Sequence, residues 1–263
     1  MNDKTNIYEF PDAKHIVVSG DIHGDFEALV DKCCTQYSMK DTLIIVAGDC
    51  GFGFQWSGYY KDIYMKLSSR LSKGNNWIVF VRGNHDNPAY FDGLQVNYKR
   101  WKAIPDYSVL KACGHTILCV GGAVSVDRTY RLSEMYGMTV VIEDDRRLEM
   151  SYYWPNEAPS YDEAKLAAID EVCAVDVVVS HTAPSFCELI SRQGIQNWLT
   201  KDEDLLQDIK AERKVMDNIQ AYLYVHSHPL DHWFYGHFHQ SWHGEIDDIR
   251  YNMLDCLELR EII

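Results

Sequence analysis

The sequence predicts an α/β domain built around a two-sheet core. Short β-branched runs alternate with longer amphipathic segments through the first half, which is the pattern of a sheet covered by helices. The second half adds further apolar runs that are typical of strands, separated by charged helical stretches. With 263 residues, of which 46% are hydrophobic, the chain can bury a large core, and a disordered or fibrous protein is excluded.

The elements of the first half follow from the position of each apolar run. We predict, in order, a strand over 15–19, a helix over 25–37, a strand over 42–47, a helix over 59–72 and a strand over 77–81. Two more short strands, 108–112 and 116–120, flank Cys113-Gly114-His115, which indicates a hairpin. The first half is therefore expected to form βαβ units followed by a hairpin.

The second half is predicted to be less regular. Residues 125–160 are aromatic and irregular, and we interpret them as a candidate substrate-cap insertion. The remaining elements are expected to be a helix over 160–172, a strand over 176–180, a helix over 201–221 and several short strands over 232–263. No repeat, low-complexity linker or step in composition divides the chain, so we expect one domain spanning 1–263.

Charge and cysteine content exclude several classes of function. The 39 acidic and 25 basic side chains give a net charge of −14, which argues against general nucleic-acid binding and against an anionic membrane surface. No apolar run is long enough to span a bilayer. The eight cysteines form no CxxC pair, and the first residues lack a secretory pattern, so we expect reduced thiols and a cytoplasmic location.

Five predicted strands end in side chains that commonly bind metals. The segments are Gly20-Asp21-Ile22-His23-Gly24, Gly48-Asp49-Cys50-Gly51, Gly83-Asn84-His85-Asp86, His181-Thr182 and Gly236-His237-Phe238-His239. Each alone is also compatible with a turn or a buried polar residue. Because ligands of open α/β sheets bind at the carboxyl ends of strands, the five segments together predict one shared site.

The number and type of these donors predict two cations. The candidate ligands are Asp21, His23, Asp49, Asn84, His181, His237 and His239. Seven donors are too many for one ion with open positions, but they suit two ions about 3.5–4 Å apart that share a carboxylate. Oxygen and imidazole donors favour Mn, with Fe or Zn as alternatives, over Mg or Ca.

The order GDIHG, GDCG, GNHD, a single His and GHFH resembles the calcineurin-like metallophosphoesterase superfamily. The resemblance covers about 15–260 and implies a four-layer α/β/β/α sandwich with a two-metal site at one edge. It also implies two ligand groups that share a bridging carboxylate: Asp21, His23, Asp49 and His239 for the first metal, and Asp49, Asn84, His181 and His237 for the second. His85 matches the catalytic histidine of the family.

The sequence departs from the Ser/Thr protein phosphatase branch of that superfamily. The branch has GDxVDRG where this chain has GDCGFG over 48–53, so the Asp that orients the catalytic histidine and an Arg that binds phosphate are both missing. Arg82 does match the RGNH of the branch. The segment GGAVSVDR, over 121–128, is similar to a group of bacterial and phage metallophosphoesterases.

These observations predict a hydrolase of phosphomonoesters or phosphodiesters. Two such cations would supply a water of lowered pKa as the nucleophile for phosphorus. His85 is the candidate that stabilises charge or protonates the leaving group, and Arg82, Arg128 and Arg131 are candidates for binding phosphate. The expected substrate is a small phosphoester, with nucleotides among the candidates; oligomeric state is not predicted.

Three alternatives stay open. The chain could act as a protein phosphatase, or it could hydrolyse dinucleoside polyphosphates. A third alternative, from a different class, is a metal-binding scaffold without chemistry. Degenerate members of such families usually lose ligands, whereas here the seven ligand types and His85 are all present.

Overall fold

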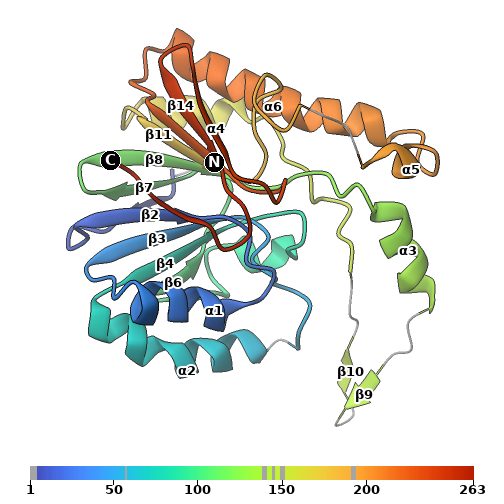
Figure 1. The fold of residues 1–263 in the computed structure, drawn as a ribbon, viewed down its shortest axis with the longest axis horizontal. Helices are drawn as coiled ribbons and strands as arrows, with labels where there is room; N and C mark the ends of the chain where they lie inside the picture. The colour runs from blue at the N-terminus through green and yellow to red at the C-terminus, as the bar shows by residue number, and fades with distance from the viewer. Residues whose placement is uncertain (1–4, 57, 138–140, 144–145, 149–151, 191–193) are drawn as a thin grey trace.

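The computed structural model describes residues 5–56, 58–137, 141–143, 146–148, 152–190 and 194–263. Two sheets lie face to face, and helices cover the outer face of each, so that the layers follow the order α/β/β/α (Figure 1). The predicted fold class is confirmed. None of the described helices combines the length and the apolar character that a membrane-spanning helix requires.

The first sheet has six strands. Its order is β15 (Leu259–Glu261), β2 (His15–Ser19), β3 (Thr42–Ala47), β4 (Trp77–Val81), β6 (Trp101–Ala103) and β5 (Asn97–Tyr98). The four central strands β2, β3, β4 and β6 are parallel, and both edge strands pair antiparallel to their neighbours. The helices α1 (Phe26–Asp31) and α2 (Tyr59–Gly74) cover its outer face.

The second sheet has seven strands. Its order is β1 (Ile7–Glu9), β7 (Ser108–Ala112), β8 (His115–Val120), β11 (Val177–Ser180), β12 (His232–Tyr235), β14 (Ile249–Met253) and β13 (Trp242–Ile246). Strands β8, β11, β12 and β14 are parallel. The helices α4 (Glu163–Asp170) and α6 (Leu205–Val225) pack on its outer face, and α5 (Gln196–Leu199) precedes α6.

Alternating side chains of the central strands fill separate cores. In β3, Leu43 and Ile45 face the other sheet, whereas Ile44 and Val46 face α1 and α2. In the second sheet, Val179 faces the space between the sheets and its neighbour Val178 faces the outer helices. Strands that are buried on both faces have continuous apolar sequences, and for this reason they could be predicted from the sequence.

Several elements differ from the sequence-based prediction. The helix predicted over 25–37 is the short helix α1 followed by a π-helical turn over Lys32–Gln36. The segment 125–160, predicted to be irregular, contains α3 (Arg128–Gly137) and the paired strands β9 (Val141–Glu143) and β10 (Arg146–Leu148), which lie to one side of the two sheets (Figure 1). Strands β1, β5 and β6 were not predicted, because two or three residues are too few to show a periodicity.

Candidate metal centre

The five polar segments meet at one edge of the two sheets. They follow the carboxyl ends of β2, β3 and β4 in the first sheet and of β11 and β12 in the second. Since these strands run parallel within each sheet, their ends lie at the same edge. The seven side chains that the sequence singled out are brought together there.

The first group of donors surrounds the buried carboxylate of Asp21. His239 Nε2 lies 3.0 Å from Asp21 Oδ2 and 3.0 Å from His23 Nε2, and His23 Nδ1 lies 3.9 Å from Asp49 Oδ2. One donor atom from each of these four residues lies within 4.8 Å of all the others. This spacing fits a single ion, as the sequence predicts for the first metal.

The second group is joined to the first by Asp49. His181 Nε2 lies 3.2 Å from Asp49 Oδ1 and 2.9 Å from Asn84 Oδ1, and His237 Nδ1 lies 3.1 Å from the same Asn84 oxygen. His181 Nδ1 lies 2.8 Å from the carbonyl oxygen of Ala47 and donates to it, which leaves Nε2 free to bind a cation. Asp49 therefore presents one oxygen to each group.

One buried carboxylate oxygen in the site lacks a well-aligned hydrogen bond. Among the described residues, Asp21 Oδ2 makes no hydrogen bond of normal geometry, although His239 Nε2 is 3.0 Å away. A buried carboxylate oxygen without a partner is costly, and a cation supplies one. The oxygen and imidazole donors thus fit the two divalent cations that the sequence predicts.

The closely spaced carboxylates and imidazoles shift the pKa values of two residues in the site. Burial alone would lower the pKa of His181, but the carboxylates of Asp49 and Asp21 outweigh it and raise that pKa to about 9. Although burial opposes the shift, His85, His181 and His23 hold the pKa of Asp49 well below its ordinary value. The carboxylates that favour positive charge on His181 would equally favour a cation beside its Nε2.

The backbone at the site is held in unusual conformations. His23, Asp49, His237 and His239 have φ values of 44°, 43°, 71° and 48°, in the left-handed region that non-glycine residues rarely adopt. Gly48 has a φ of 98°, and a Cβ placed on it would lie 2.1 Å from His181 Nδ1. The ligands are thus positioned by tight turns that leave no room at Gly48 for a larger residue.

Two side chains that the sequence analysis missed orient Asn84. Asn84 Nδ2 donates to Ser125 Oγ at 2.9 Å, and Ser125 Oγ donates to Glu157 Oε2 at 2.6 Å. Burial raises the pKa of Glu157 to about 7. Ser125 lies within GGAVSVDR, whose similarity to other metallophosphoesterases assigns no role to the serine, and Glu157 lies in a segment whose path the sequence could not predict.

Asp86, the last residue of GNHD, organises the loop after β3. Its buried carboxylate accepts hydrogen bonds from the backbone N–H groups of Cys50, Gly51, Phe52 and Gly83, at 2.8–3.0 Å. The loop that carries Asp49 is thereby tied to the loop that carries Asn84 and His85. Asp86 thus has a structural task that its motif alone did not reveal.

His85 lies at the border of the metal groups. Its backbone N–H donates to Asp49 Oδ1 at 2.7 Å, and its ring centroid lies 5.4 Å from that of His23. The guanidinium of Arg131 contacts the His85 ring, and Arg131 is itself held by Asp127 Oδ1 at 2.7 Å and by the carbonyl oxygen of Tyr152 at 3.1 Å. Burial, with Arg131, lowers the pKa of His85.

The three candidate arginines have different surroundings. Arg82 is buried, and it donates to the carbonyl oxygen of Glu157 at 2.6 Å and to Asp106 Oδ2 at 2.9 Å. Arg128 binds the carboxylates of Asp202 and Asp208 at 2.6 Å each. Of the three, Arg131 is the one that contacts the site, through His85.

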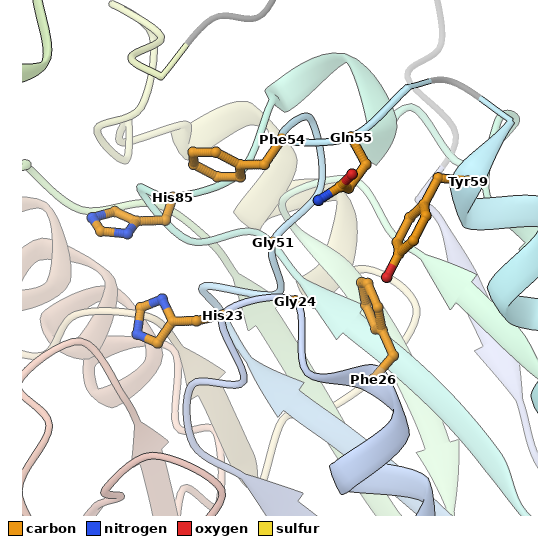
Figure 2. Close-up of a pocket in the computed structure, with 8 residues that line it drawn as sticks. All are labelled: His23, Gly24, Phe26, Gly51, Phe54, Gln55, Tyr59 and His85. Carbon is orange, nitrogen blue, oxygen red and sulfur yellow. The ribbon is translucent and has the colours of Figure 1, made fainter. Parts of the chain in front are cut away.

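A cavity of about 270 Å³ opens beside the metal groups. Figure 2 shows His23 and His85 on one side of it and Phe54, Gln55 and Tyr59 on the other. Phe54 in turn contacts Trp154, with ring centroids 5.3 Å apart, and so joins this wall to the segment interpreted as a cap.

The chain matches the family model described as calcineurin-like phosphoesterase over residues 14–241, and it belongs to that family. Among solved structures, it is similar to TT1561 of Thermus thermophilus, with a TM-score of 0.53 and 12% identity over 95% of this chain and 98% of that one. It is also similar to a dimetal phosphatase from Danio rerio, with a TM-score of 0.48 and 11% identity over 94% and 88% of the two chains.

Proposed function

We propose that this chain hydrolyses phosphomonoesters or phosphodiesters with the help of two divalent cations, with Mn as the expected metal and Fe or Zn as alternatives. The observation that carries the proposal is the position of Asp49. Its Oδ1 faces His181 and its Oδ2 faces His23, so one carboxylate spans both groups of donors. The buried Asp21 Oδ2, which has only the His239 ring nearby and no well-aligned hydrogen bond among the described residues, supports the same conclusion.

The proposed ligand sets follow the two groups. The first consists of Asp21, His23, Asp49 and His239, and the second of Asp49, Asn84, His181 and His237. When bound, two such cations supply an activated water and offset negative charge on the phosphate oxygens. Ser125 and Glu157 keep the Asn84 oxygen directed at His181 and His237.

Two residues outside the ligand sets act on the substrate in this proposal. His85 stabilises charge on the leaving-group oxygen or protonates it, since it borders the metal groups without belonging to either. Arg131 binds a phosphate oxygen, because its guanidinium already lies against His85 and Asp127 holds it in place. Arg82 and Arg128 are left with structural roles, since carboxylates and carbonyl oxygens occupy their donors.

The proposed substrate is a small phosphoester with a planar leaving group, for which nucleotides are the natural candidates. The aromatic rings of Phe54 and Tyr59 line the cavity beside His85, and base-sized rings stack on such side chains. The residues over 125–160 act as the cap of a single domain in this proposal. A cytoplasmic location is proposed from the eight cysteines, all of which are free thiols.

Hydrolysis assays with added Mn²⁺ test the proposal. We expect p-nitrophenyl phosphate or bis-p-nitrophenyl phosphate to be cleaved, the activity to disappear with chelator, and His85→Ala to lower kcat by about 10²–10⁴-fold. Phosphopeptides and dinucleoside polyphosphates belong in the same panel. A metal-loaded protein that cleaves none of these substrates would contradict the proposal and favour the scaffold alternative.

The arginine assignment has its own test. We expect Arg131→Ala to lower kcat/KM for p-nitrophenyl phosphate by about 10-fold or more while the protein remains folded. Arg128→Ala is the matched control, since Arg128 lies on the same helix; it breaks the ion pairs with Asp202 and Asp208 and should lower thermal stability. If Arg128→Ala, and not Arg131→Ala, reduced kcat/KM, the assignment would be wrong.

A further inference from the structure

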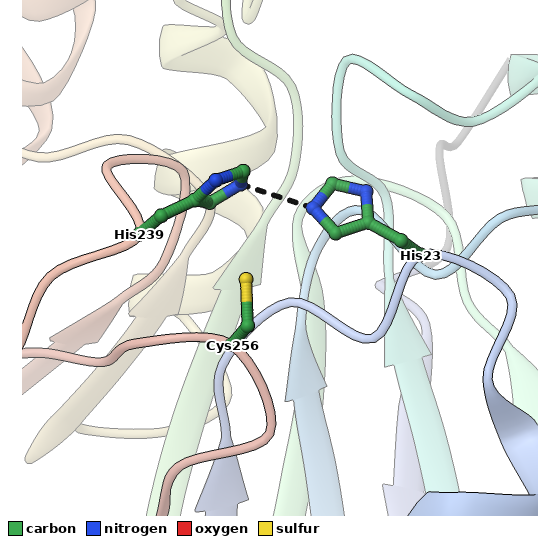
Figure 3. A group of neighbouring side chains, drawn as sticks. All are labelled: His23, His239 and Cys256. Atoms are coloured by element: carbon green, nitrogen blue, oxygen red, sulfur yellow. Dashed lines mark hydrogen bonds between the residues drawn. The ribbon is translucent and has the colours of Figure 1, made fainter.

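A cysteine follows the carboxyl end of a strand that the sequence analysis did not connect with the site. Strand β14 pairs parallel to β12, which carries His237 and His239 at its end, so the two strands end at the same edge. Cys256 comes three residues after β14. Figure 3 shows its sulfur directed toward the pair of rings formed by His23 and His239. The Cys256 Sγ and one nitrogen of each ring all lie within 4.8 Å of one another.

The turn that carries Cys256 is fixed to the loop that carries Asp21. The backbone N–H of Leu257 donates to the carbonyl oxygen of Asp21 at 2.9 Å, and that of Gly20 donates to the carbonyl oxygen of Glu258 at 3.0 Å. The carbonyl oxygen of Leu257 in turn accepts from Lys32 Nζ at 2.6 Å. These backbone hydrogen bonds therefore hold the turn that carries the thiol beside the loop that carries Asp21 and His23.

A second observation points to a ligand at the same place. Asp21 Oδ2, completely buried and without a hydrogen bond of normal geometry among the described residues, lies 3.0 Å from His239 Nε2 and 3.8 Å from His23 Nε2. The carboxylate oxygen therefore lies beside the same two imidazoles that the thiol approaches. His23 and His239 belong both to the first-metal donors already described and to a group that includes the Cys256 sulfur.

We propose that Cys256 binds the first cation as a thiolate ligand. The inference rests on the proposed metal centre and specifies its first site. On binding, the thiol loses its proton to solvent as the metal–sulfur bond forms. Thiolate is a soft ligand that favours Zn²⁺, Co²⁺ or Fe²⁺ over Mn²⁺, Mg²⁺ or Ca²⁺. Cys256 therefore sets the metal preference of the first site, whereas the second site has only oxygen and nitrogen donors.

Cobalt substitution tests the bond directly. Co²⁺ bound to a thiolate absorbs strongly in the near ultraviolet through sulfur-to-metal charge transfer, which oxygen and nitrogen ligands do not produce. We expect the metal-free protein titrated with Co²⁺ to develop this band, and Cys256→Ser to lack it. Cys113→Ser is the matched control, because Cys113 is also an exposed free thiol but lies in the β7–β8 hairpin, where it contacts Ala13.

Metal affinity provides the second measurement. Cys256→Ser should weaken binding of Zn²⁺ by about 10-fold or more, on the scale seen when groups that support metal ligands are removed, and should change Mn²⁺ affinity little. Circular dichroism will verify that the variant is folded, as expected for an exposed position. An unchanged band and unchanged Zn²⁺ affinity in Cys256→Ser would overturn the inference and leave the proposed function intact. A wild-type protein that binds neither metal would overturn both.

Discussion

At the scale of single residues, the two central carboxylates of the site are candidate metal ligands and also accept hydrogen bonds from the backbone. Asp21 Oδ1 accepts from the backbone N–H of His237 at 3.0 Å, and Asp49 Oδ1 accepts from that of His85 at 2.7 Å. These bonds help to hold turns whose left-handed residues cost roughly 1–3 kcal/mol each. Strain of this kind persists only where the surroundings over-determine it, which is typical of functional sites.

The first prediction at this scale concerns the hydrogen bonds that orient the Asn84 amide. Ser125→Ala removes the acceptor for Asn84 Nδ2, so the amide loses its fixed orientation toward His181 and His237. We expect the affinity for the second Mn²⁺ to fall by roughly 10–100-fold, as measured by calorimetric titration. Ser108→Ala is the control, because Ser108 is equally buried but its hydroxyl donates to the carbonyl oxygen of Pro105. Equal affinity in the two variants would show that Ser125 does not support the ligand.

The sequence could predict some of these residues and not others for physical reasons. The seven candidate ligands lie directly after strands that are buried on both faces, and such strands are recognisable as apolar runs. Glu157 and Cys256 follow no such rule. Glu157 reaches Ser125 from a long segment without periodicity, and the strand before Cys256 alternates exposed and buried residues at its start, so neither could be placed beside the site from the sequence.

At the scale of elements, the accuracy of the prediction depends on the length of each element and its burial. The strands over 42–47 and 77–81 were predicted with the bounds that β3 and β4 have in the structure, because both are buried throughout. The helix predicted over 201–221 is α6 in the structure, and both of its ends lie four residues further along the chain. The start of that helix has no side-chain cap, so no local signal marked it.

Helix α6 also provides a prediction about pH. Glu212 is buried on this helix, accepts hydrogen bonds from the Val124 N–H and from Thr182 Oγ1, and burial raises its pKa to about 7. Above its ordinary pKa, the unfolded chain releases this proton while the folded chain keeps it. The free energy of unfolding therefore decreases as the pH rises from about 5 to 7, by up to about 3 kcal/mol at 1.4 kcal/mol per pKa unit.

Glu212→Gln removes that titration. In urea unfolding of the metal-free protein at pH 5 and pH 8, we expect the wild type to lose more stability than the variant over this interval. Glu245→Gln, at an exposed position in β13, is the control and should behave as the wild type does. If wild type and Glu212→Gln lost equal stability, the buried carboxylate would not be the group responsible.

At the scale of the whole molecule, the chain is acidic, and the buried carboxylates of Asp21 and Asp49 lie where its two sheets meet. The net charge of −14 disfavours anionic ligands at long range, and cations bound as proposed would reverse that field locally. The site also joins the sheets, since Asp21 and Asp49 come from the first and His181 and His239 from the second. Cation binding should therefore stabilise the whole fold and not only the loops.

Thermal unfolding with and without Mn²⁺ measures this coupling. At 100-fold excess over the dissociation constant, one bound ion adds about 2.7 kcal/mol, and we expect the wild-type Tm to rise by roughly 5–10 °C. Asp21→Asn should lose much of this rise, because it removes the charge of the buried carboxylate while an amide oxygen can still accept from the His237 N–H. Asp12→Asn, in an exposed turn, should keep the full rise. The same Tm rise in Asp21→Asn as in wild type would contradict a cation at the first site, because that carboxylate lies at its centre.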